Sequence, residues 1–244
     1  MMDLVPDKPR KPLIERFLAL FEVLLLSGLL SSSLAALPLA AFNKKGAELL
    51  TNDVKTLSSF LLLETAITIF LLVMVLKVHR ETICSLGLQW DRWKRNLLIG
   101  LALVPFLFLI NDFVAIAFRI YLPQYYTEKN PLTEIIHTPQ QLALFVFSAL
   151  IAGGIKEELQ RAFIINRFGR YLGGAAVGLV LWSFAFGAGH YVQGVQGVAI
   201  ATIYGLIFGI TYLVSGSLIA PIVAHGAYDA VALLAYWFFS GRFK

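Results

Sequence analysis

The chain has 244 residues, of which 58% are hydrophobic and only 14% are charged, and its mean hydropathy is +0.76. Soluble domains typically contain ~25% charged residues, so this composition excludes a soluble globular protein and predicts one integral-membrane domain over residues 1–244. The net charge of +5 does not indicate a nucleic-acid partner, because the basic residues cluster at the ends of apolar runs. The single cysteine, Cys84, excludes an internal disulfide.

Apolar runs predict the number of membrane crossings. At ~20 apolar residues per crossing, the sequence predicts an all-α membrane bundle of about seven transmembrane helices, within a range of six to eight. Basic residues precede the first run, as in a signal peptide, but that run continues to about Phe42, so we expect a retained helix. The expected spans lie roughly at 14–37, 56–77, 97–120, 141–166, 174–191, 195–214 and 217–239.

The distribution of basic residues between the loops predicts the orientation. Eleven lysines and arginines fall on the inner side and six on the outer side if the N-terminus is cytoplasmic, which favours that orientation in a cell membrane. The inner ones are Lys8, Arg10, Lys11, Arg16, Lys77, Arg80, Arg92, Lys94, Arg95, Arg167 and Arg170, and the outer ones are Lys44, Lys45, Arg119, Lys129, Arg242 and Lys244.

Four charged residues interrupt the fourth expected span: Lys156, Glu157, Glu158 and Arg161. A charge near the bilayer centre costs at least ~2.5–3.5 kcal/mol, so this cluster needs a functional or structural reason. Either glutamate can pair with Arg161, at i,i+4 or i,i+3. The two glutamates point about 100° apart on an α-helix, so one can face a cavity while the other pairs with Arg161. A purely structural ion-pair cluster is the alternative.

Two histidine-containing groups follow on later spans. Phe186 and His190 end the fifth, and His225 and Asp229 share a face of the seventh at i,i+4. A rise of ~1.5 Å per residue puts both groups and Glu157 around mid-membrane depth, where they can line one cavity.

Such a set of residues suits hydrolysis. A desolvated glutamate can take a proton from water while one histidine holds that water, and a second donor stabilises the oxyanion. Alternatively, Glu157, His190 and His225 could hold a divalent metal such as zinc, although the spacing is not that of a HExxH site. No cofactor is expected.

Glu64 and the pair Asn111–Asp112 also fall inside spans, where they are either functional or form interhelical hydrogen bonds.

The ordered set Glu157-Glu158…Arg161, Phe186-x-x-x-His190 and His225-x-x-x-Asp229 resembles the three motifs of the CAAX protease and bacteriocin-processing (abortive-infection) family of intramembrane proteases. The resemblance extends over about residues 75–240. It implies hydrolysis of a lipidated or membrane-bound peptide, with a glutamate and His190 activating water. It also implies an oxyanion site formed by His225 and its i+4 partner, with Arg161 and Phe186 supporting the site.

The first motif departs from the family pattern, in which three residues separate the glutamate pair from the arginine. Here only Leu159 and Gln160 intervene, so alignment on Arg161 places the usual two glutamates on Lys156 and Glu157. Alignment on the glutamate pair instead makes Glu157 the base and Glu158 its neighbour. We predict Glu157 as the base, because it keeps a glutamate in either alignment, and we include Glu158 among the catalytic residues. Asp229 replaces the more usual asparagine, and would act as a protonated donor or by orienting His225.

Two other classes of function remain open. A catalytically silent scaffold or immunity protein of the same fold would bind a membrane partner, and a proton-coupled carrier would use a relay through Glu64, Asp112, Glu157 and His190. The hydrolase hypothesis predicts a peptide or protein substrate at the lipid bilayer.

Overall fold

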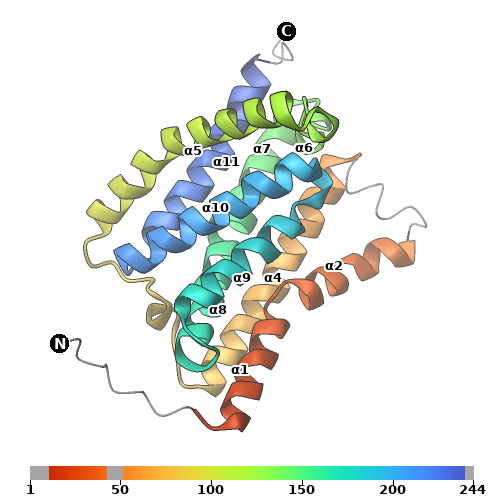
Figure 1. Ribbon diagram of the computed structural model, residues 1–244. Coiled ribbons are helices and arrows are strands. Elements are labelled where there is room, and N and C mark those ends of the chain that lie inside the picture. Colours follow the sequence, from red (N-terminus) through yellow and green to blue (C-terminus); the bar gives the residue numbers. More distant parts are fainter. Residues whose placement is uncertain (1–10, 43–51, 240–244) are drawn as a thin grey trace, which may run out of the picture.

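A computed structural model describes residues 11–42 and 52–239, and all regular elements in these two segments are helices (Figure 1). The α-helices are α1 (Leu13–Leu25), α2 (Leu29–Phe42), α4 (Val54–Val78), α5 (Trp93–Tyr121), α6 (Pro131–Glu134), α7 (Pro139–Ala149), α8 (Glu158–Tyr171), α9 (Ala175–Gly189), α10 (Gly194–Ser215) and α11 (Ile219–Phe239). A π-helical segment, η3 (Leu150–Glu157), joins α7 to α8, and three short 3-10 turns are η1 (Ile83–Leu86), η2 (Pro123–Tyr125) and η4 (Tyr191–Gln193).

The all-helical prediction is confirmed, and five stretches are long and apolar enough to cross a membrane. They are Leu13–Pro38, Val54–Val78, Trp93–Tyr121, Tyr191–Ser215 and Ile219–Phe239. The two other expected spans also form helices. The fourth is the charge-bearing run of α7, η3 and α8, and the fifth is α9, which has only 15 residues. The structure therefore supports five spans by length and composition, and the count of seven remains a prediction.

The first predicted span is not one straight helix. The chain breaks between α1 and α2 at Gly28, whose φ of +93° lies in the region that glycine tolerates best, and the two helices diverge in Figure 1. A break inside an apolar run leaves backbone groups without intrahelical partners. Gln160 from α8 supplies one partner, since its Nε2 donates a hydrogen bond of 2.6 Å to the Leu26 carbonyl.

The first two turns of helix α8 are buried within the bundle. The helix packs against α1, α9 and η3, and its residues from Glu158 to Ile165 are all buried. Phe163, Ile164 and Ile165 join a core cluster with side chains of α4 and α9, among them Leu72 and Trp182. The buried part of α8 has no solvent to hydrate its charges, so each charged group there needs a partner inside the bundle.

The outer faces of the bundle are apolar. Leucines and phenylalanines on α1 and α5 are exposed, including Phe17, Phe21, Leu109 and Phe113. In water such a large apolar surface would promote association, whereas in a bilayer it faces acyl chains. Of the basic residues that predict the orientation, Lys8, Arg10, Lys44, Lys45, Arg242 and Lys244 lie outside the described residues.

Candidate active site

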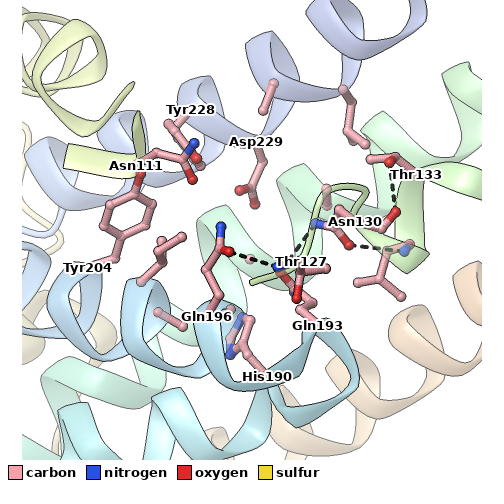
Figure 2. A pocket seen from close by; sticks show the side chains of 18 of the residues that line it. Asn111, Thr127, Asn130, Thr133, His190, Gln193, Gln196, Tyr204, Tyr228 and Asp229 are labelled. Atoms are coloured by element: carbon pink, nitrogen blue, oxygen red, sulfur yellow. Dashed lines mark hydrogen bonds between the residues drawn. The ribbon is translucent and has the colours of Figure 1, made fainter. Parts of the chain in front are cut away.

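A cavity of about 450 Å³ lies among η3, α9, α10 and α11. Glu157, His190, His225 and Asp229 all line it, as does Phe186. In Figure 2 the Asp229 carboxylate extends into this space from α11, and Gln196 and Tyr204 approach it from α10. Residues from three separated motifs therefore meet in one cavity, lined by polar and apolar side chains, inside an apolar helix bundle.

Glu158 does not line the cavity but takes part in a buried ion pair. Its Oε1 pairs with Arg161 and also lies 2.8 Å from Nδ1 of His225. The side chains of Glu158 and Arg161 are each only 1% exposed. The guanidinium of Arg161 lies 4.7 Å from the ring centre of Phe186, within cation–π range. Glu158 and Arg161 thus connect α8 to α9 and α11.

The two glutamates diverge where the helix changes type. The π-helical segment η3 ends at Glu157 and the regular α-helix α8 begins at Glu158. A π-helix is rare and frequently occurs at functional sites. Glu157 faces the cavity at 19% side-chain exposure, and Glu158 faces Arg161.

His225 is held on three sides. Its ring stacks on Phe208 at 4.7 Å between ring centres, and Nδ1 faces Glu158. The other ring nitrogen, Nε2, lies 3.9 Å from Oε2 of Glu157 and 3.6 Å from Oδ2 of Asp229. Nε2 is therefore the ring atom directed at the two cavity carboxylates.

His190 is oriented by the backbone of its own helix. Its Nδ1 lies 2.8 Å from the Phe186 carbonyl oxygen. A carbonyl can only accept, so Nδ1 carries the hydrogen, and Nε2 of the neutral ring is an acceptor. The Phe186 ring packs on the imidazole at 4.6 Å between centres. This arrangement makes Nε2 of His190 available to a water molecule.

Glycine at position 153 keeps the site open. A Cβ atom there would lie 2.7 Å from Oδ2 of Asp229 and 3.3 Å from Nε2 of His225. A contact under 3.0 Å forces a neighbouring atom to move. The next residue, Gly154, would place a Cβ 3.2 Å from Cα of Gly226, so the glycine pair also allows η3 to approach α11 closely.

The other polar groups predicted inside spans have different positions. Asn111 lines the cavity, whereas the exposed Asp112 does not, and the two side chains are 3.4 Å apart. Glu64 lies outside the cavity lining and pairs with Lys156 at 3.1 Å. Lys156 thus connects Glu64 to Glu157, whereas Asp112 lies outside the cavity lining, and the carrier relay through Glu64, Asp112, Glu157 and His190 stays a prediction.

Several cavity residues were not predicted from the sequence. Gln193, Gln196, Tyr204 and Tyr228 line it, and so do Tyr126, Thr127, Glu128 and Asn130 of the segment between α5 and α6. Oε1 of Gln196 accepts a hydrogen bond of 2.9 Å from the Thr127 backbone, drawn in Figure 2. Gln193 and Gln196 follow His190 by three and six residues, and Tyr228 directly precedes Asp229. Their closeness to predicted site residues could have indicated them, whereas nothing in the sequence around Tyr204 indicates a cavity residue.

Within the described residues, no three His, Cys, Asp or Glu side chains are grouped as a metal site. The metal alternative for Glu157, His190 and His225 stays a prediction.

The comparisons with known proteins agree with the motifs. The family model described as type II CAAX prenyl endopeptidase Rce1-like matches residues 138–231, which run from the cap of α7 into α11 and include all three motifs. No curated protein and no solved structure matches the chain. The resemblance predicted from the motifs is therefore confirmed: residues 138–231 match the Rce1-like type II CAAX prenyl endopeptidases, a group within the CAAX protease family of membrane proteases.

Proposed function

We propose that this protein is an intramembrane endopeptidase that cleaves a lipidated or membrane-bound peptide with water activated by Glu157 and His190. The observation that carries the proposal is the shared cavity, which the Glu157 carboxylate and the imidazoles of His190 and His225 line together. The family match over residues 138–231 supports a peptidase of the CAAX type.

In the proposed reaction, water is held between the Glu157 carboxylate and Nε2 of His190. Glu157 accepts a proton from the water as the oxygen bonds to the substrate carbonyl carbon. The tetrahedral intermediate then collapses with cleavage of the C–N bond. The leaving amine takes the proton from Glu157, which restores the carboxylate.

His225 and Asp229 form the oxyanion side of the proposed site. With Nδ1 directed at Glu158, a doubly protonated His225 presents its Nε2–H to the developing oxyanion. Oδ2 of Asp229 lies 3.6 Å from that nitrogen. Asp229 then either orients His225 as a carboxylate or donates directly when protonated.

The substrate proposal follows from the position of the cavity. The surrounding helices present apolar side chains outward, so a peptide with a lipid chain can keep that chain in the bilayer while its backbone enters the cavity. We place the protein in the cell membrane, with its N-terminus in the cytoplasm, on the basis of the loop charges.

A silent scaffold or immunity protein is the second candidate. The observation that favours it is the contact between Lys156 and Glu157, in which an ammonium lies 3.4 Å from Oε1 of the proposed base. A scaffold would keep its partner after Glu157 and His190 are replaced, whereas a protease would lose activity.

The test uses the full-length protein in liposomes and a farnesylated Cys-aliphatic-aliphatic-X peptide, with the product identified by mass spectrometry. We expect wild type to release the C-terminal tripeptide, and Glu157→Gln and His190→Ala to lower kcat about 10²–10⁴-fold, the range of acid–base contributions. Glu15→Gln and His137→Ala are matched controls outside the cavity lining and should cleave normally. Normal cleavage by Glu157→Gln would contradict the proposal, as would an intact peptide with wild type.

A further inference from the structure

Lys156 is a buried cation beside the proposed base, but it does not line the cavity. Its side chain is 5% exposed. The ammonium lies 3.1 Å from Oε2 of Glu64 and 3.4 Å from Oε1 of Glu157. One lysine therefore bridges a glutamate of α4 and the glutamate that faces the cavity.

Glu64 fixes the far side of this bridge. Its Oε1 accepts a hydrogen bond of 3.1 Å from Ser32 on α2, and its side chain is 8% exposed. Each oxygen of Glu64 thus has a separate partner, one on α2 and one on η3. Lys156 is consequently tied to α4 and, through Glu64 and Ser32, to α2, which is the kind of support that a side chain positioning a reactive group needs.

The bridge distinguishes the two oxygens of Glu157. Oε1 faces Lys156, and Oε2 lies 3.9 Å from Nε2 of His225. A carboxylate held at one oxygen cannot rotate freely about its last side-chain bond. The contact with Lys156 therefore leaves Oε2 as the oxygen presented to the cavity.

We infer that Lys156, anchored by Glu64, is a positioning residue that orients the Glu157 carboxylate for proton transfer. This inference rests on the proposed function, because it assigns Glu157 the role of base. Displacement of a reacting group by about 1 Å can lower a rate about 10²-fold. Loss of the bridge should thus affect turnover more than substrate binding.

A structural role would produce a different result. Removing one partner of a buried ion pair leaves an uncompensated charge and destabilises the protein, whereas removing both charges is often neutral. The variants Lys156→Met and Lys156→Met/Glu64→Gln separate the two roles, because the double variant no longer has an unpaired carboxylate at position 64. The glutamine introduced there also keeps an acceptor for the Ser32 hydroxyl.

Arg167 provides a matched control on the same helical run. It is also a buried cation between two carboxylates, at 2.6 Å from Glu22 and 2.9 Å from Glu81. It lies ten residues beyond Glu157, roughly 15 Å along the helix axis, and outside the cavity lining. Arg167→Met should lower the thermal unfolding midpoint and leave kcat per folded molecule unchanged.

The experiment measures kcat, KM and the unfolding midpoint with the farnesylated peptide in liposomes. We expect Lys156→Met to lower kcat about 10²-fold with KM within about threefold, and the double variant to regain the midpoint but not kcat. Recovery of both by the double variant, or normal kcat in Lys156→Met, would overturn the inference. Glu157→Gln separates the two proposals. If it cleaves normally, the role of Glu157 is wrong and the inference fails with it; if it is inactive while Lys156→Met is normal, only the inference fails.

Discussion

Nδ1 of His225 lies 2.8 Å from Oε1 of Glu158, and the same carboxylate pairs with Arg161. The second glutamate of the motif thereby links three helices, since Phe186 of α9 packs on the guanidinium. The first glutamate remains directed at the cavity. Glu157 and Glu158 therefore have different surroundings, and we expect their substitution to affect cleavage and stability differently.

Glu158→Ala should mainly destabilise the protein. It leaves Arg161 as an uncompensated buried charge, which costs about 3–5 kcal/mol. We expect a clearly lower unfolding midpoint in detergent, measured with a thiol-independent fluorescence assay, and little change in the midpoint for Glu157→Gln. Equal midpoints for Glu158→Ala and wild type would contradict the buried pair.

Gly153→Ala should abolish cleavage without removing any reactive group. The added Cβ would lie 2.7 Å from Oδ2 of Asp229, so Asp229 or η3 has to move. Gly189→Ala is the matched control, because a Cβ at Gly189 has no neighbouring heavy atom within 4 Å. The comparison of kcat for the two variants tests the crowding directly, and equal activity would show that the site tolerates the methyl group.

Asp229→Asn should retain at least wild-type activity. An asparagine has about the same size and carries N–H donors that can serve an oxyanion in any protonation state. Asp229→Ala removes both the charge and the donor, and should lower kcat by about 10²-fold, the lower range for loss of one oxyanion donor. If Asp229→Asn is as inactive as Asp229→Ala, a negative charge at this position is required.

Chelation should leave the cleavage rate unchanged. We propose a metal-free reaction, so pre-incubation with EDTA or 1,10-phenanthroline, followed by measurement of the initial rate, should have no effect. Loss of activity that returns on addition of Zn²⁺ would instead support the metal alternative at Glu157, His190 and His225.

The cap of α4 should give a measurable pH dependence of stability. The Thr56 hydroxyl donates a hydrogen bond of 2.7 Å to the Asp53 carboxylate and the Thr56 backbone N–H one of 2.8 Å, and together they hold the pKa of Asp53 below its ordinary value. This stabilisation is present above the unfolded pKa of ~3.9 and is lost as pH falls through the lower folded value. Asp53→Ala should cost about 1 kcal/mol at pH 7.

Asp53→Asn serves as the control for this cap. Asparagine is an equally good N-cap residue without a titrating group, so its contribution should not change with pH. Thermal unfolding of wild type and both variants between pH 3 and pH 7 gives the comparison. If the stability of wild type and Asp53→Asn depends on pH in the same way, the Asp53 carboxylate is not the titrating group of the α4 cap.

The helical class of fold and four of the residues that line the cavity could be predicted from the amino-acid sequence alone. Continuous apolar runs of ~20 residues cross a bilayer as helices, in which every backbone hydrogen bond is made within the segment, and charges inside such runs are costly enough to indicate a site. The depth of Glu157, His190, His225 and Asp229 in their predicted spans, and the order of the three motifs, predicted that these residues can line one cavity, and in the structure they do.

The pairing of these residues depends instead on how the helices pack. Arg161 is close to both glutamates on a helix, at i,i+3 and i,i+4, so local spacing left the pairing open. Arg161 pairs with Glu158 in the structure. Two features accompany this pairing: α11 brings His225 to the same carboxylate, and the helix changes from π to α between the two glutamates. The bridge from Lys156 to Glu64 joins residues 92 positions apart, and such a contact is set by helix packing, which no local pattern encodes.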